Sequence, residues 1–243
     1  MEFGPAIFEK KYKTPAINPK DEEIFREILK PKNWDFKMFK SALIVSGKLN
    51  AYPFNTPDSI HLGALRRSID VIKEKTLKTG NEYSKGFFVD LTENKLIGGK
   101  TTEGDDHSCY ANWDKPENDH ELKHSILLHS HPTVYAGVHL SPRDYITFLN
   151  DPELVSMMMT CSGTELMALK TFQTPNNFNQ NSLEKSINAL LAEFLGKNPK
   201  IPDIIRYQKA VCLENALSLY IATSSNKDLA KKVDLFDDEK IYS

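Results

Sequence analysis

The stretch HSILLHSHPTVYAGVHLSPRDYITFLN, residues 124–150, joins an apolar strand pattern to closely spaced metal-binding side chains. Its apolar run, residues 126–128, predicts a buried β-strand that ends near His129 and His131. Because successive side chains of a strand point to opposite faces, these two imidazoles project from the same side. Two imidazoles in this arrangement can bind one metal ion.

A helix start follows after a loop. Ser141 and Pro142 precede apolar residues at helical spacing, which predicts a helix as far as Asn150. Ser141 is a typical N-cap, and Asp144 in the first turn complements the helix dipole. Asp144 is also an oxygen donor that, with the two imidazoles, leaves a fourth tetrahedral position for water, as in catalytic zinc sites. The capping and the metal-binding interpretations both remain open at this point.

The order His129-x-His131-Pro132, then Ser141-x-x-Asp144, resembles the signature of the JAMM (MPN-plus, JAB1/MPN/Mov34) metallopeptidases. That family cleaves isopeptide and peptide bonds at the C-termini of ubiquitin and ubiquitin-like proteins. The resemblance implies a Zn²⁺ ion bound by both histidines and the aspartate, and an α/β fold with an MPN-type β-sandwich core flanked by helices. Nine residues, 132–140, separate the two halves of the motif, where seven are usual, and His139 among them could be a further ligand. Bacterial and phage-like members of the family vary in this loop, and the resemblance is to a bacterial-type member.

The resemblance also requires a glutamate at the start of an earlier strand. Residues 58–79 have the apolar spacing of a long helix, and Gly80 is a plausible C-cap. Glu82 comes shortly after Gly80 and four residues before the first residue of a strand predicted at 86–91, so the family's general base is carried over to Glu82. Two later acids, Glu93 and Glu103, are weaker candidates because both lie in predicted turns.

These assignments imply a mechanism. Zinc lowers the pKa of a bound water toward about 7. Glu82 would accept the proton of that water and pass it to the leaving amine, acting as general base and then general acid. The hydroxyl of Ser141 would donate a hydrogen bond to the oxyanion. The substrate would be ubiquitin or a ubiquitin-like protein.

Two alternatives remain. His120-Glu121-x-x-His124 matches the zincin metallopeptidase motif, which requires a helix. The polar, proline-containing segment before it and the strand pattern after it do not favour a helix. A non-catalytic MPN-type scaffold that binds a partner without metal is the other alternative.

His107 and Cys109 are two further possible metal ligands, but a single His-x-Cys pair is only weak evidence for a metal site.

The remainder of the chain predicts three regions. Residues 1–57 are expected to be an N-terminal extension with a helix at 21–29, and residues 58–175 the JAMM/MPN-like catalytic domain. Residues 176–243 are expected to form a C-terminal helical region with a frayed end. Within the last two regions we expect strands at 95–100, 156–161 and 164–172, and helices at 182–195 and 202–223.

Composition narrows the function classes. The 243 residues are 40% apolar and 26% charged, as in ordinary globular proteins. The net charge of −2, without a block of lysine or arginine, argues against nucleic acid as a partner. No apolar run approaches the roughly 20 residues of a membrane span. Three widely separated cysteines indicate a reducing compartment, and without a signal-peptide pattern we expect a cytoplasmic protein.

Overall fold

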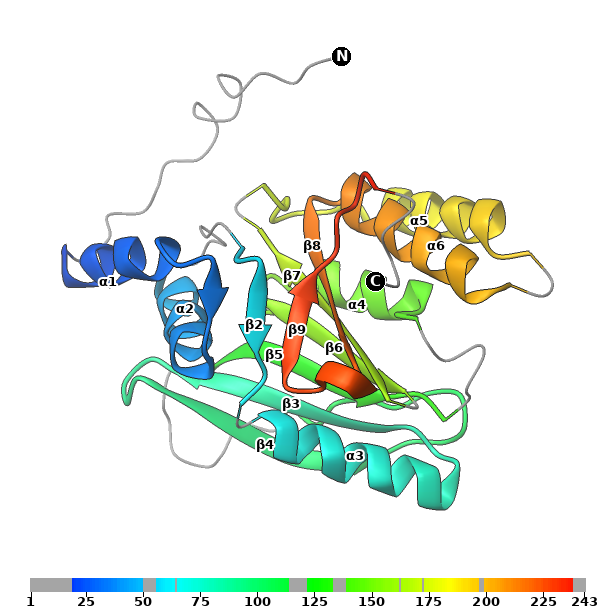
Figure 1. Cartoon of the computed structure of the whole chain (residues 1–243), viewed down its shortest axis with the longest axis horizontal. Coiled ribbons are helices and arrows are strands. Elements are labelled where there is room, and N and C mark those ends of the chain that lie inside the picture. The colour runs from blue at the N-terminus through cyan, green and yellow to red at the C-terminus, as the bar shows by residue number, and fades with distance from the viewer. Residues whose placement is uncertain are drawn as a thin grey trace, which may run out of the picture.

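The computed structural model describes residues 19–49, 56–63, 65–113, 122–132, 139–161, 163–171, 173–196 and 199–237. Within these ranges the chain forms one mixed nine-stranded sheet with helices on both faces, which confirms the α/β class (Figure 1). The helices are α1 (Pro19–Leu29), α2 (Phe36–Leu49), α3 (Leu65–Thr79), α4 (Pro142–Asn150), α5 (Gln180–Phe194) and α6 (Ile201–Glu214). The strands are β1 (Asn33–Trp34), β2 (Ser59–His61), β3 (Tyr83–Asp90), β4 (Lys95–Glu103), β5 (Leu122–Ser130), β6 (Ser156–Cys161), β7 (Thr164–Lys170), β8 (Leu217–Thr223) and β9 (Leu229–Lys232).

The strands lie in the order β1-β2-β9-β8-β7-β6-β5-β3-β4. The β1–β2 and β5–β6 pairs are parallel, and the remaining neighbours are antiparallel. The sheet twists strongly, so that β3 and β4 run across the direction of β2 and β9 in Figure 1. No helix in the described ranges is long and apolar enough to cross a membrane.

Each face of the sheet has its own hydrophobic cluster. Helices α1, α2 and α3 pack on one face, and α4, α5 and α6 on the other. Strand β5 contributes to both: Ile126 and Leu128 lie in the first cluster and Leu127 in the second. The same alternation directs His129 toward α4 and Ser130 toward α3.

Most of the expected local elements form. The strands predicted at 86–91, 95–100, 156–161 and 164–172 correspond to β3, β4, β6 and β7, and the helices at 21–29 and 182–195 to α1 and α5. The helix after Ser141 is α4. Gly80 follows α3 with φ +76°, a left-handed conformation that glycine adopts without strain at a helix end.

The predicted helix over 58–79 is wrong at its start. Residues 59–61 form β2, and the helix begins only at Leu65. Ile60 is fully buried in the sheet, opposite Ala230 of β9. Gly63, with φ +46°, separates strand from helix. The partner that makes this segment a strand lies far along the chain, beyond the reach of local periodicity.

The predicted helix over 202–223 is also wrong in its second half. Helix α6 ends at Glu214, Ala216 adopts φ +51°, and 217–223 become the interior strand β8. Leu219 faces the second cluster and Tyr220 the first, so β8 is buried on both sides. The sequence of a strand that is buried on both faces is a continuous apolar run. Such a run also has apolar residues at helical spacing, so it can be mistaken for a helix.

The flanking regions contribute to the same sheet and core. Trp34 and Phe39, from the expected N-terminal extension, are fully buried in one cluster with Ile126 and Leu128. The expected C-terminal region supplies β8 and β9 as well as two helices. Residues 229–232 form β9, so this part of the predicted frayed end is ordered.

Candidate metal centre

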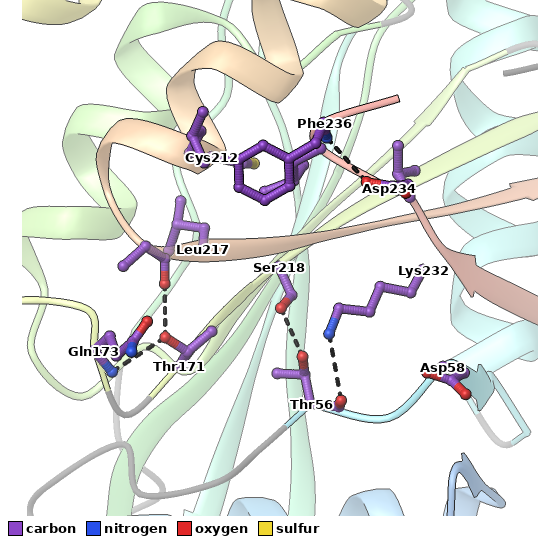
Figure 2. Close-up of a pocket in the computed structure, with 14 residues that line it drawn as sticks. Thr56, Asp58, Thr171, Gln173, Cys212, Leu217, Ser218, Lys232, Asp234 and Phe236 are labelled. Carbon is purple, nitrogen blue, oxygen red and sulfur yellow. Dashed lines mark hydrogen bonds between the residues drawn. The ribbon is translucent and has the colours of Figure 1, made fainter. Parts of the chain in front are cut away.

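Two of the pockets formed by the described residues are lined by both helices and strands of the sheet. One of about 830 Å³ lies between the end of α6, β8 and the segment after β9 (Figure 2). Its hydroxyls are engaged within the protein: Thr56 Oγ1 lies 2.6 Å from Ser218 Oγ, and Thr171 Oγ1 donates to Ala216 O at 2.7 Å. The described residues place no group of metal-binding side chains there.

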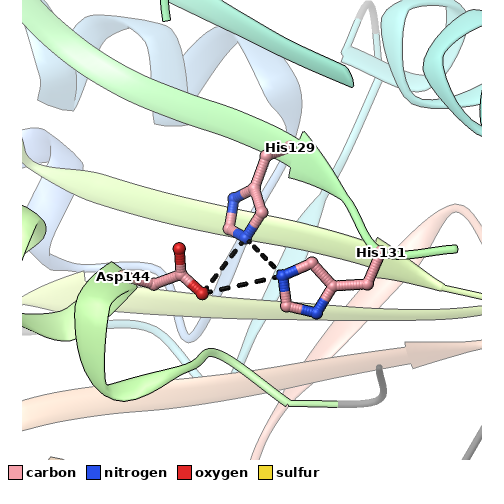
Figure 3. Close-up of side chains that lie close together, drawn as sticks. All are labelled: His129, His131 and Asp144. Carbon is pink, nitrogen blue, oxygen red and sulfur yellow. Dashed lines mark hydrogen bonds and ion pairs between the residues drawn. The ribbon is translucent and has the colours of Figure 1, made fainter. Parts of the chain in front are cut away.

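The other pocket contains the histidines of the sequence motif. His129 Nε2 lies 3.2 Å from His131 Nε2 and 3.4 Å from Asp144 Oδ2, and His131 Nε2 lies 3.7 Å from the same oxygen (Figure 3). Ligands about 2.0–2.2 Å from a tetrahedral zinc ion lie about 3.3–3.6 Å from one another. The three donor atoms therefore fit three corners of a tetrahedral site, and among the described residues they form the one group that can hold a metal ion.

Comparisons with family models, curated proteins and solved structures found no match. The geometry of the site and the sequence motif therefore carry the functional inference.

Two elements bring the donors together. His129 is near the end of β5 and almost fully buried, and His131 follows the strand, where its backbone N–H donates to Thr160 O of β6 at 3.1 Å. Asp144 comes from the first turn of α4. Its Oδ2 accepts from the backbone N of Ser141 at 2.7 Å, while Ser141 Oγ accepts from the backbone N of Asp144 at 3.2 Å. This reciprocal pair is a capping box.

The charges of the three donors depend on one another. Burial disfavours the ionised carboxylate of Asp144, but the neighbouring His129 and His131 and the N–H of Ser141 hold its pKa well below the usual range. Burial likewise disfavours the imidazolium of His129, but the Asp144 carboxylate outweighs it and raises the pKa of His129 above 6.5. A metal ion would replace the proton that His129 holds in this ion pair.

Glu82 lies beside the triad. It directly precedes β3, and its Oε1 is 3.8 Å from His131 Nε2. Its backbone is held by the loop after β4: Glu82 N donates to Asp105 O at 2.7 Å, and Gly104 N donates to Glu82 O at 2.8 Å. Burial, together with the nearby Asp144 carboxylate, raises the pKa of Glu82 to about 7, in spite of the opposing effect of His129.

The pocket around these residues has a volume of about 340 Å³. Ser141 lines it, so its hydroxyl, which accepts from Asp144 N, can still donate its own hydrogen into the pocket. The segment after β4 forms the opposite wall with Tyr110 and Trp113, and Arg143 of α4 donates to the Tyr110 hydroxyl. Sequence reasoning missed these wall residues, because a segment without regular periodicity carries no signal for its partner.

Cys109 also lines the pocket, where its thiol interacts with Ser84 and Glu82. Burial raises the pKa of Cys109 to about 12, so the thiol stays protonated at neutral pH. His107 is exposed, and neither residue belongs to the triad. The weak metal signal of this pair is therefore not borne out.

His124, Glu93 and Glu103, which the sequence also offered as metal ligand or general base, do not line this pocket. His124 sits on β5 rather than on a helix, with Nδ1 2.7 Å from Asp151 Oδ2 and its ring stacked on Trp113 at 4.1 Å between centroids. The two preceding residues of the zincin motif, 120 and 121, lie outside the described residues. Glu93 pairs with Lys95, and Glu103 accepts from Asn81; both glutamates are exposed.

Proposed function

We propose that this protein is a zinc-dependent peptidase of the JAMM type that hydrolyses peptide or isopeptide bonds at the C-terminus of ubiquitin or a ubiquitin-like protein. One observation carries the proposal: two imidazoles and a carboxylate stand at the spacing of a tetrahedral site, and Glu82 lies 3.8 Å from one of them inside the same pocket. Along the chain, α3 is followed by Glu82, β3, β5 and α4, which is the order in which the resemblance places the glutamate, the histidines and the aspartate, and this supports the same assignment.

The roles of the side chains follow from their chemistry. A bound zinc ion supplies a Lewis acid that polarises a carbonyl and acidifies water. The carboxylate of Glu82, with a pKa of about 7, exchanges a proton readily near neutral pH. It can therefore accept a proton from the attacking water and transfer it to the leaving amine. The Ser141 hydroxyl donates to the oxyanion, an interaction whose loss typically lowers the rate about 10²–10³-fold.

Two other functions make different demands on these residues. A two-histidine, one-carboxylate set also binds Fe(II) in oxygenases, which keep several coordination positions open. The near-tetrahedral spacing and the carboxylate of Glu82 favour zinc and hydrolysis instead. A non-catalytic scaffold requires neither a metal triad nor a buried glutamate with a raised pKa. Buried groups of this kind lower the stability of a protein, so their presence is better explained by a catalytic role than by a scaffold role.

A cleavage panel tests the proposal. Fusions of several ubiquitin-like proteins and di-ubiquitins would be incubated with zinc-loaded protein, with and without a chelator. We expect cleavage that the chelator abolishes, that Glu82→Gln abolishes with zinc retained, and that His129→Ala abolishes with zinc lost. Zinc binding without cleavage of any panel member would contradict the substrate assignment, and iron in place of zinc would contradict the reaction class.

A further inference from the structure

Ser130 stands between the two histidines and faces the other way. Strand alternation turns His129 toward α4 and Ser130 toward α3, where its side chain is almost fully buried. It is therefore outside the metal pocket, among the contacts that join β5 to α3 and β3.

The hydroxyl of Ser130 is fully hydrogen-bonded. Its Oγ accepts from the backbone N of Tyr83 at 3.0 Å and lies 3.3 Å from Tyr83 O, to which it donates. Thr76 Oγ1 of α3 also forms a hydrogen bond with Ser130 Oγ, and Thr76 is the donor when the single hydroxyl hydrogen of Ser130 is directed at Tyr83 O. One donor and two acceptor positions are all that a serine hydroxyl offers, so this set uses its whole capacity.

These bonds lie where the ladder between β3 and β5 stops. The last paired residues of the two strands are Ser84 and His129. One residue earlier on β3, Tyr83 is held by the Ser130 side chain, and one residue earlier again, Glu82 bonds to the loop at 104–105. The Ser130 hydroxyl thus continues the connection between β5, whose end lies between the two histidines, and the residue next to Glu82.

We propose that Ser130 is a positioning residue that fixes Glu82 relative to His129 and His131 by binding the Tyr83 backbone. This inference rests on the proposed function for its catalytic consequence. Its structural consequence, a coupling between Ser130 and Glu82, holds whether or not a substrate is known. Ser130 does not line the metal pocket, and it acts through the Tyr83 backbone.

The catalytic test uses Ser130→Ala. A displacement of about 1 Å in a catalytic group can lower the rate about 10²-fold. We expect kcat of the zinc-loaded variant to decrease by roughly 10–100-fold, with KM within about twofold of wild type and the same zinc content. Ser130→Thr keeps the hydroxyl and should restore most of the rate. Ser156→Ala, which removes a buried strand serine bonded to Ala168 O at 3.1 Å, is the matched control and should leave kcat unchanged.

A second test uses the metal-free full chain and needs no substrate. If Ser130 holds Glu82 beside His131, the change in Tm that Glu82→Gln produces should shrink by more than about half in the Ser130→Ala background, and stay the same in the Ser156→Ala background. Equal changes in both backgrounds would overturn the inference and leave the proposed function intact. An inactive protein that shows the coupling would retain the inference and reject the function. If Ser130→Ala does not fold, Ser130→Cys, nearly isosteric with weaker hydrogen bonds, gives the same comparison.

Discussion

Asp144 accepts a hydrogen bond of 2.7 Å from the backbone N–H of Ser141 through Oδ2, the oxygen that also faces both imidazoles. Asp144 Oδ2 thus completes the capping box and also lies at the distance from both imidazoles that shared binding of a metal ion would need. The capping box fixes the carboxylate in the direction of the histidines before any metal binds, as expected of a preorganised site.

The two roles of Asp144 can be separated by substitution. Asp144→Asn keeps an oxygen that accepts from Ser141 N but removes the negative charge. We expect zinc affinity to fall by about 100-fold or more, with a loss in the free energy of unfolding below about 1 kcal/mol. Asp144→Ala should lose both the affinity and about 1–2 kcal/mol from the helix cap. Chelator competition and denaturant titration measure the two quantities, and equal unfolding free energies for both variants would contradict the shared role.

As the pH is lowered, the zinc affinity of this site should begin to fall at a higher pH than that of a site whose histidines have ordinary pKa values. The pKa of His129 in the metal-free protein is raised above 6.5, and metal must displace that proton. Affinity is thus expected to be constant at alkaline pH and to start falling while the pH is still above 6.5. Calorimetric titration in buffers of different ionisation enthalpy should detect proton release at neutral pH. Metal binding without proton release there would contradict the ion pair.

Removing the charge of Glu82 should stabilise the metal-free protein. Its folded pKa of about 7 exceeds the ordinary 4.5, so the folded state binds more protons between these values and the free energy of unfolding falls as the pH rises through this window. At about pH 8 the burial cost of the carboxylate is fully present, and Glu82→Gln should increase stability by on the order of 1 kcal/mol. At about pH 4 the difference should vanish. A destabilised variant at the higher pH would show that Glu82 is not held in an unfavourable environment.

A second buried charge gives a prediction away from the site. Lys170 Nζ donates to Asp151 O at 2.7 Å, and burial lowers the pKa of Lys170 to about 7. Since an unfolded lysine stays protonated up to about 10.5, the folded state gains stability as the pH rises between these values. Lys170→Met lacks this gain, so its stability relative to wild type should be higher at about pH 6 than at about pH 10. Denaturant titrations at both values test this, and the same difference at both would refute it.

Local chemistry explains which parts of the site the sequence could predict. The spacing of His129 and His131 at the end of a strand and the Ser141–Asp144 cap are short-range features with a fixed geometry. Glu82 is different: no local pattern distinguishes it from a solvated acid at a strand edge, and only the family resemblance points to it. The hydrogen bonds of Ser130 could not be predicted from the sequence either, because its partners Tyr83 and Thr76 are far away along the chain.

The two errors in the predicted helices, at residues 58–79 and 202–223, have the same physical origin. Both β2 and β8 are strands only because distant segments pair with them: β2 with β9, and β8 with β7 and β9. Helical and strand periodicities are hard to separate in short apolar runs, and long-range pairing decides between them. Segments such as β3 and β6, with turn residues at their ends, have no such ambiguity.

The most direct test of the central claim is the metal content of the purified full chain, measured by elemental analysis after removal of loosely bound ions. We predict one zinc ion per chain for wild type and for Glu82→Gln, and almost none for His129→Ala or His131→Ala. Wild-type protein that binds no metal after incubation with zinc, or histidine variants that retain the full amount, would show that His129, His131 and Asp144 do not form a metal centre.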